Sequence, residues 1–153
     1  MRTSFTLSIA TIAGSTLPVF AENVDFTGTV VAGCTLAVDT PGTMALNTDG
    51  TELSSDNALG ATVTILSVGT NTVTVGAPSL ESAPTEYLGT PTTEVKYTGL
   101  AGLAAVDQAF TDQSTNFAVS TLPLTELVVG ARATDTGGFE AGTYVVRTVV
   151  TCE

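Results

Sequence analysis

The sequence predicts an all-β protein, folded as a sandwich or barrel of short strands. Three observations predict this fold class. Runs of β-branched residues recur at short intervals, and Gly, Pro, Asn and Asp separate them. Charged residues make up only 12% of the chain, whereas Thr, Gly, Val and Ala are abundant. Segments near both ends alternate between apolar and polar residues with a period of two, which is typical of half-buried strands.

The first 21 residues predict an export signal. Arg2 supplies a positive charge, Phe5 to Gly14 is mildly apolar, and the end of the segment offers a cleavage site after Ala21. The apolar stretch is too short, and too often interrupted by Thr and Ser, to span a bilayer. We therefore expect an exported mature chain that begins at Glu22, carries no membrane span and forms a single domain.

Residues 22–33 predict a strand that has no partner nearby in the sequence. Its apolar positions share one parity, and they are Val24, Phe26, Gly28 and Val30. Asp25, Thr27 and Thr29 take the other parity, and no turn pairs the segment with a following strand before Cys34. An apolar strand at a free end pairs with a sheet edge, in its own fold or in another molecule. The sequence leaves both options open.

Residues 34–153 predict one β-sandwich domain. The expected strands are β-branched runs between turn signals: Thr43–Asn47, Leu59–Val68, Thr72–Ala77, Thr93–Thr98, Thr115–Ser120, Glu126–Ala133 and Thr143–Cys152. The polar, acidic stretch Asn47–Asn57 and the Pro-, Ser- and Thr-rich stretch Pro78–Pro91 are expected to be loops. An Ala-Ala-Val-Asp-Gln-Ala string within Gly102–Phe110 predicts one short helix.

The two cysteines, Cys34 and Cys152, predict a disulfide, because an exported protein matures in an oxidising compartment. Cys152 shares its parity with Tyr144, Val146 and Val150, so it is expected to face the interior. Cys34 shares its parity with Val24 and Phe26. Two free buried thiols or a link between two chains are the alternatives.

The composition argues against an enzyme. The chain has no His, which excludes Ser-His and Cys-His catalysis and His-bound metals, and its only lysine, Lys96, is expected on the solvent face of a strand. No phosphate loop, dinucleotide fingerprint or zinc-spaced cysteine pair appears, so no cofactor and no metal are predicted. A net charge of −11 disfavours nucleic acid as a partner. Weak Ca²⁺ binding at Asn47–Asn57 stays open.

The chain resembles the subunits of chaperone–usher pili, including the secreted pilins called spore-coat-U-like. Three features carry the resemblance: the alternating, glycine-containing segment Val24–Val30, a cysteine shortly after it at Cys34, and a final Gly-Thr-Tyr strand that begins at Gly142. The resemblance implies an immunoglobulin-like sandwich that lacks its last strand. The N-terminal segment of the next subunit then fills the resulting groove.

The resemblance also implies the roles of particular residues. Val24, Phe26, Gly28 and Val30 would be the groove-filling positions of the donor strand, and Gly28 would lie where the partner backbone comes close. Tyr144, Val146 and Val150 would form one wall of the acceptor groove. The implied partners are copies of the chain in an extracellular fibre, a periplasmic chaperone and an outer-membrane usher.

The function expected from the sequence is therefore a structural subunit of an extracellular fibre that assembles by donor-strand exchange. The alternative is a secreted, self-contained β-sandwich in which residues 24–30 pair with their own sheet. Such a domain would bind a ligand or a cell surface through acidic loops such as Asn47–Asn57.

Overall fold

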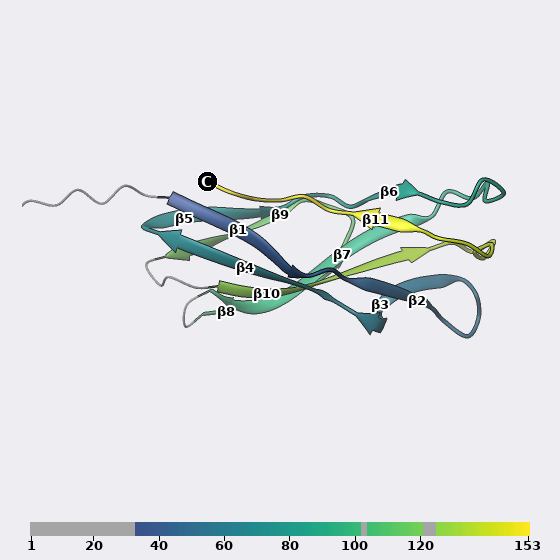
Figure 1. Ribbon diagram of the computed structural model, residues 1–153, viewed down its shortest axis with the longest axis horizontal. Coiled ribbons are helices and arrows are strands. Elements are labelled where there is room, and N and C mark those ends of the chain that lie inside the picture. The colour runs from purple at the N-terminus through teal and green to yellow at the C-terminus, as the bar shows by residue number, and fades with distance from the viewer. Residues whose placement is uncertain (1–32, 102–103, 121–124) are drawn as a thin grey trace, which may run out of the picture.

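The computed structural model describes residues 33–101, 104–120 and 125–153, and these residues form an antiparallel β-sandwich (Figure 1). The predicted all-β fold class is confirmed, because the described residues contain no helix. None of them belongs to a helix long and apolar enough to cross a membrane. The export signal and the proposed donor positions Val24, Phe26, Gly28 and Val30 lie outside the described residues.

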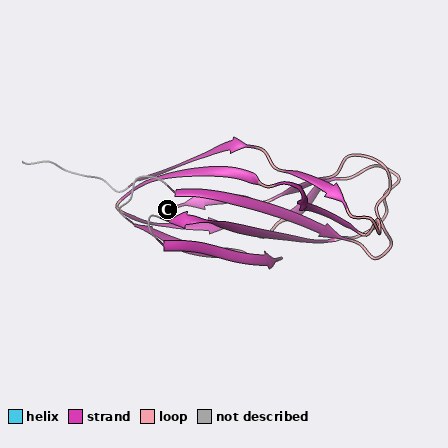
Figure 2. Cartoon of the chain, turned by 90° about the horizontal axis from the view of Figure 1, so that it is seen from below, coloured by secondary structure: helices cyan, strands magenta, loops and turns pink. Residues whose placement is uncertain are grey.

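The strands follow one another with short connections. In chain order they are β1 (Gly33–Thr40), β2 (Thr43–Leu46), β3 (Glu52–Leu59), β4 (Ala61–Val68), β5 (Thr70–Val75), β6 (Ser79–Ser82), β7 (Thr92–Ala101), β8 (Ala104–Thr111), β9 (Thr115–Ser120), β10 (Thr125–Thr134), β11 (Val145–Arg147) and β12 (Val150–Cys152). They run roughly along the long axis of the molecule, and many of the described loops gather at one end of it (Figure 2).

The larger sheet is built around β10. One edge of β10 pairs with β7 along the whole strand, and β7 in turn pairs with β8. The other edge pairs first with β4 and then with β3, so that Val129 lies opposite both Tyr97 and Ala61. β1 pairs with the outer edge of β4, and β2 pairs with β3.

The opposite layer is made from a three-stranded and a two-stranded sheet laid end to end. β5 pairs with β9 and β12, while β6, which follows β5, pairs with β11. Between these two sheets lies Gly76, whose NH donates to the carbonyl oxygen of Val149 at 2.8 Å. The Thr148 hydroxyl donates back to the Gly76 carbonyl oxygen at 2.6 Å, so Gly76 is hydrogen-bonded through both its NH and its C=O.

The core lies between the layers, in the half of the sandwich formed by β4, β5, β7, β9 and β10. Its buried hydrophobic residues are Val63, Ile65, Val73, Val75, Val95, Tyr97, Val119, Leu127 and Val129. The alternation within β4 explains this arrangement, since Val63 and Ile65 are buried whereas Leu66 points to solvent. Burial of such side chains contributes about 1.5–3 kcal/mol each.

The expected helix at Gly102–Phe110 is wrong. Its described part belongs to β8, which forms an antiparallel hairpin with β7. Val106 packs against the core, and Phe110 lies half-buried beneath Lys96 and Arg132. Cross-strand pairing and this packing override the helix propensity of the alanines.

The two expected loops each contain a strand. The second half of Asn47–Asn57 belongs to β3, and Pro78–Pro91 contains β6. In β3 the buried residues are Ser54 and Ser55, which hides the usual apolar alternation. The Ser55 hydroxyl accepts a hydrogen bond from the NH of Ala131 at 3.0 Å, which satisfies the buried hydroxyl.

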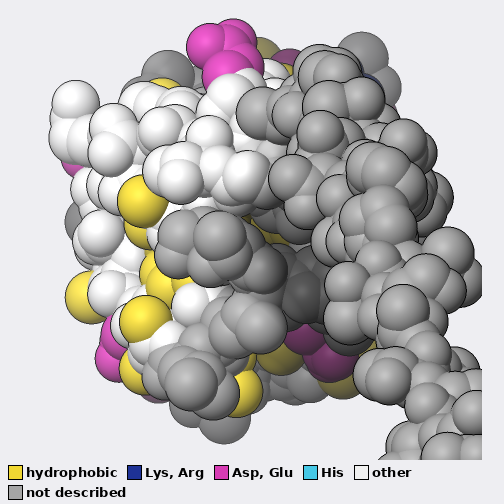
Figure 3. Space-filling view, turned by 90° about the vertical axis from the view of Figure 1, so that its left-hand side faces the viewer, with side chains coloured by type: hydrophobic (Ala, Val, Ile, Leu, Met, Phe, Trp, Pro, Cys, Tyr) yellow, Lys and Arg dark blue, Asp and Glu magenta, His cyan; other side chains and the backbone are white. Residues whose placement is uncertain are grey.

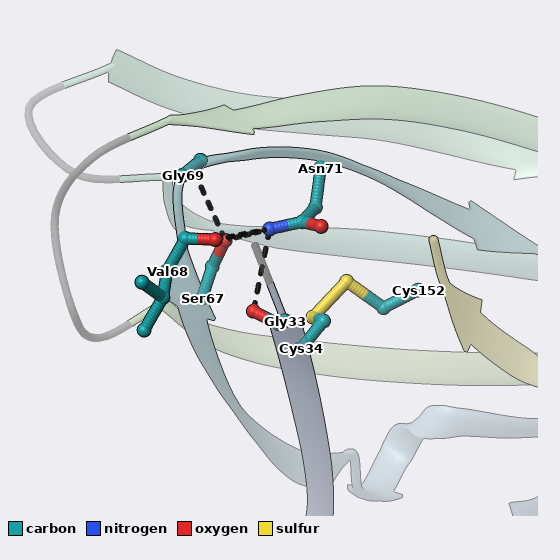
Figure 4. The surroundings of a disulfide bond; sticks show 7 residues. All are labelled: Gly33, Cys34, Ser67, Val68, Gly69, Asn71 and Cys152. Atoms are coloured by element: carbon teal, nitrogen blue, oxygen red, sulfur yellow. Dashed lines mark hydrogen bonds between the residues drawn. A yellow bond between two sulfur atoms is a disulfide. The ribbon is translucent and has the colours of Figure 1, made fainter. Parts of the chain in front are cut away.

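The predicted disulfide between Cys34 and Cys152 is confirmed, with a Cα–Cα distance of 5.9 Å. It links the start of β1 in one layer to the end of β12 in the other (Figure 4). The first and last described strands are therefore tied together at one end of the sandwich.

Candidate functional site: an apolar groove between the first and last strands

An open groove of about 800 Å³ lies among the described residues, away from the disulfide. One wall comes from the end of β1 and the start of β2, namely Val38 and Pro41–Met44. The other wall is the segment Gly142–Thr148, which contains β11. The groove thus lies between β1 and β11.

The β1 wall exposes a side chain that belongs to the inner face. Cys34 and Leu36 are half-buried and pack against the core, and Val38 shares their parity in the strand. Val38 is nevertheless 68% exposed, because no described residue covers it across the groove. A β-bulge between Val38 and Thr40 then turns the chain toward Pro41.

The opposite wall presents the edge of a strand. All seven consecutive residues from Gly142 to Thr148 line the groove, as expected when a strand turns its edge, rather than one face, toward a cavity. In the described part of the chain β11 pairs with β6 alone. The second edge of β11 therefore offers backbone NH and C=O groups for further pairing.

The floor of the groove is continuous with the core. Val95 and Val129, at 0% and 7% exposure, lie at its base together with Ala131 from β10 and Leu53 from β3. A side chain that enters the groove would therefore extend the hydrophobic core. The gain in such a case is about 25 cal/mol per Å² of apolar surface removed from water.

The groove is nearly free of charge. Arg147 is the one charged residue among those that line it, and its guanidinium pairs with the Glu81 carboxylate on β6 at 2.7 Å. This pairing leaves the lining suited to apolar side chains. It also contrasts with the chain as a whole, which carries a net charge of −11.

Three aromatic rings lie beside the start of the last strand. Tyr144 packs edge-on against Tyr87 and Phe139, with centroids 5.2 Å away in each case, and its hydroxyl donates to the carbonyl oxygen of Glu140 at 3.0 Å. The Tyr87 hydroxyl donates to the carboxylate of Asp135. The cluster orients Tyr144 at the groove wall.

The pKa values of Tyr87 and Asp135 shift in opposite directions. Burial, followed by the hydrogen bond to Asp135, raises the pKa of Tyr87. The same hydrogen bond, helped by the NH of Gly137, lowers the pKa of Asp135. Both shifts favour a neutral phenol that donates to a charged carboxylate.

The structure places the predicted wall residues in two settings. Tyr144 and Val146 line the groove, whereas Val150 packs against the core cluster nearer the disulfide. Sequence reasoning missed Val38 and the Pro41–Met44 turn on the other wall. The parity of Val38 with Cys34 and Leu36 was the available signal, since an inward position at the end of a first strand needs a partner.

Two other predicted features lie away from the groove. Lys96 is half-buried rather than exposed, because it pairs with Asp56 and lies 4.8 Å from the centroid of Phe110. In the Asn47–Asn57 turn, Asn47 Oδ1 accepts hydrogen bonds from the NH groups of Thr51 and Glu52. The described residues contain no group of three or more His, Cys, Asp or Glu side chains that could hold a metal ion.

The end that carries the start of β1 has a different surface. Viewed from that end, its described part shows hydrophobic and acidic side chains (Figure 3).

Comparison with known proteins gives no relative from which a function could be transferred: no protein-family model, curated protein or solved structure matches the chain. The functional argument therefore rests on the groove itself.

Proposed function

We propose that the protein is a structural, non-enzymatic subunit of an extracellular fibre, and that its groove accepts a β-strand from a neighbouring copy. The observation that carries this proposal is the open apolar groove between β1 and β11. It combines a hydrophobic floor with an available strand edge, which are the two requirements of β-strand addition. In the wider class that the sequence resembles, the fold would be an immunoglobulin-like sandwich completed by this strand.

The proposed donor is the segment Val24–Val30. It has seven residues, as many as the Gly142–Thr148 wall of the groove. Its alternating apolar residues Val24, Phe26 and Val30 would point to the floor, while Gly28 would allow close approach of the two backbones. The segment carries one charge, at Asp25 on the opposite parity, so the face that enters the groove is uncharged.

Such a contact is heterologous, because the donor segment and the groove are different surfaces of one chain. Heterologous contacts that do not close into a ring generate filaments. We propose that the chain is exported, that a periplasmic chaperone occupies the groove before assembly, and that an outer-membrane usher assembles the fibre. The chaperone would protect the same edge from premature pairing.

The test compares the wild-type mature chain with Val38→Arg and Leu88→Arg, using electron microscopy and size-exclusion chromatography. Both positions are largely exposed, at 68% and 92%, so neither arginine should unfold the domain, but only Val38 lines the groove. We expect fibres from the wild type and from Leu88→Arg, and monomers from Val38→Arg.

A second arm removes residues 22–31. Loss of fibres in this shortened chain would support the proposal. Fibres that still form without the segment would contradict it. A monomeric wild-type chain whose residues 24–30 are fully protected from hydrogen exchange would favour the self-contained sandwich instead.

A further inference from the structure

We propose that the Cys34–Cys152 disulfide is an end stop for the groove, which excludes a strand from one end of it and keeps the chain's own N-terminal segment from placing its whole Val24–Val30 stretch there. This inference rests on the proposed function, and it assigns to the disulfide a role in choosing the partner. The bridge joins β1, which provides one groove wall, to β12, which follows the other wall segment Gly142–Thr148 along the chain.

The spacing of the strands shows where an additional strand fits. Neighbouring strands lie about 4.8 Å apart, so two strands that flank an inserted one are about 9.6 Å apart. At the bridge the Cα atoms of Cys34 and Cys152 are 5.9 Å apart, and the two sulfur atoms occupy the intervening space. No strand can pass between β1 and β12 at this point.

The groove opens at the same distance from the bridge on both walls. Val38 is four residues beyond Cys34 along β1, and Thr148 is four residues before Cys152 along the last strand. At about 3.3 Å per residue, both walls begin about 13 Å from the bridge. The groove therefore begins at the same chain distance from the closed end on both of its walls.

The upstream segment leaves the domain at the closed end, because β1 begins at Gly33, immediately before the bridge. The side chain of Asn71, which is 6% exposed, holds this exit in place. Its Nδ2 donates to the Ser67 hydroxyl at 2.7 Å and to the carbonyl oxygens of Val68 and Gly33 at 3.1 and 3.4 Å (Figure 4). The exit point is thus fixed by buried polar contacts as well as by the disulfide.

Chain length then keeps part of the Val24–Val30 segment of the same chain out of the groove. Val38, the nearest groove residue on β1, is five residues from Gly33, or about 17 Å along the strand. Val30 is only three residues before Gly33 and reaches at most about 11 Å from it. A chain that folds back on itself therefore cannot bring Val30 to the near end of the groove, whereas the segment of a second copy enters from the open end without this limit.

The experiment maps which copy supplies the strand, and how far the strand runs. A photo-crosslinking amino acid, benzoylphenylalanine, replaces either Val145 in β11 at the groove wall or Thr151 in β12 beside the bridge, and both positions are exposed. ¹⁵N-labelled and unlabelled mature chains are mixed before assembly, and crosslinked peptides are identified by mass spectrometry. Each position is tested in the oxidised protein and in Cys34→Ala/Cys152→Ala, whose folding is checked by circular dichroism.

In the oxidised protein we expect crosslinks from position 145 to residues 24–30, with mixed-label pairs at the frequency of random mixing, and none from position 151. In the bridge-free protein we expect crosslinks from position 151 as well. Same-label pairs alone at position 145, crosslinks from position 151 in the oxidised protein, or silence at position 151 in a folded bridge-free protein would each overturn the end stop.

The absence of any crosslink between residues 24–30 and position 145 is a different result, because it would overturn the proposed function itself. If the bridge-free chain does not fold, the oxidised protein alone still tests whether the bridge excludes the strand. Its label pattern at position 145 and the result at position 151 report directly on whether the bridge end is closed to the strand.

Discussion

At the residue scale, the hydrogen bond between Tyr87 and Asp135 links two loops at the end of the sandwich that carries the groove. Asp135 follows β10, and Tyr87 lies between β6 and β7. Tyr87 also stacks on Phe139, with ring centroids 5.7 Å apart, and so supports Tyr144 at the groove wall. A single phenol therefore connects the electrostatics of the loops with the shape of the site.

The hydrogen bond between Tyr87 and Asp135 makes the stability of the fold depend on pH. The folded-state pKa of Asp135 lies below its unfolded value, so its contribution is present above about pH 3.9 and is lost as the pH falls through the folded pKa. In Tyr87→Phe we expect the pKa of Asp135 to rise toward its ordinary value, retaining only the effect of the Gly137 NH. Carboxyl-carbon NMR titration measures this.

Tyr97→Phe is the matched control, because the Tyr97 hydroxyl bonds to Thr115 rather than to a carboxylate. We expect the pKa of Asp135 to be unchanged in this variant. An unchanged pKa in Tyr87→Phe as well would show that the phenol is not the cause of the shift.

At the element scale, the pairing of β7 with β10 depends on a glycine, Gly99. Gly99 lies opposite Leu127, and a Cβ atom at this position would collide with the backbone oxygen of Glu126 and lie 2.8 Å from a Leu127 methyl carbon. The central pair of the larger sheet therefore has no room for a side chain at this point.

Gly99→Ala should lower the free energy of unfolding by about 2 kcal/mol, because backbone atoms must move to admit the methyl group. Urea unfolding followed by circular dichroism measures the change. Gly33→Ala is the control, since a Cβ there meets no atom within 4 Å and should leave stability nearly unchanged. Equal stability of the two variants would contradict this description of the β7–β10 pair.

The sequence predicted the elements whose apolar residues alternate, and it failed where polar residues face inward or where propensity conflicts with pairing. β4 and β10 were expected from their alternation. β3 was taken for a loop because Ser54 and Ser55 are its buried residues, and Ala131, whose NH donates to the Ser55 hydroxyl, is distant in sequence. β8 was taken for a helix because its pairing with β7, which no single segment encodes, outweighs its alanines.

The candidate site was only half predictable for a related reason. Tyr144 and Val146 were expected at a groove wall from the resemblance to pilin subunits, and both line the groove. The wall formed by Val38 and the floor formed by Val95 and Val129 depend on how the two layers pack, which a strand pattern does not specify.

At the scale of the whole molecule, the sandwich is closed at one end and open at the other. The disulfide joins the layers where the described chain begins and ends, both near one end of the sandwich (Figure 1), while the groove lies between β1 and β11. An open hydrophobic groove with an available strand edge is a liability for an isolated domain. We propose that this liability is the site of assembly.

Hydrogen exchange of the Gly142–Thr148 backbone, measured by mass spectrometry in isolated mature chains and in assembled fibres, tests this claim most directly. The account predicts that these amides exchange rapidly in the isolated chain and become protected in the fibre. The amides of Val150–Cys152, beside the closed end, should change little. Equal exchange of Gly142–Thr148 in the two states would contradict the account, because the groove would then receive no strand.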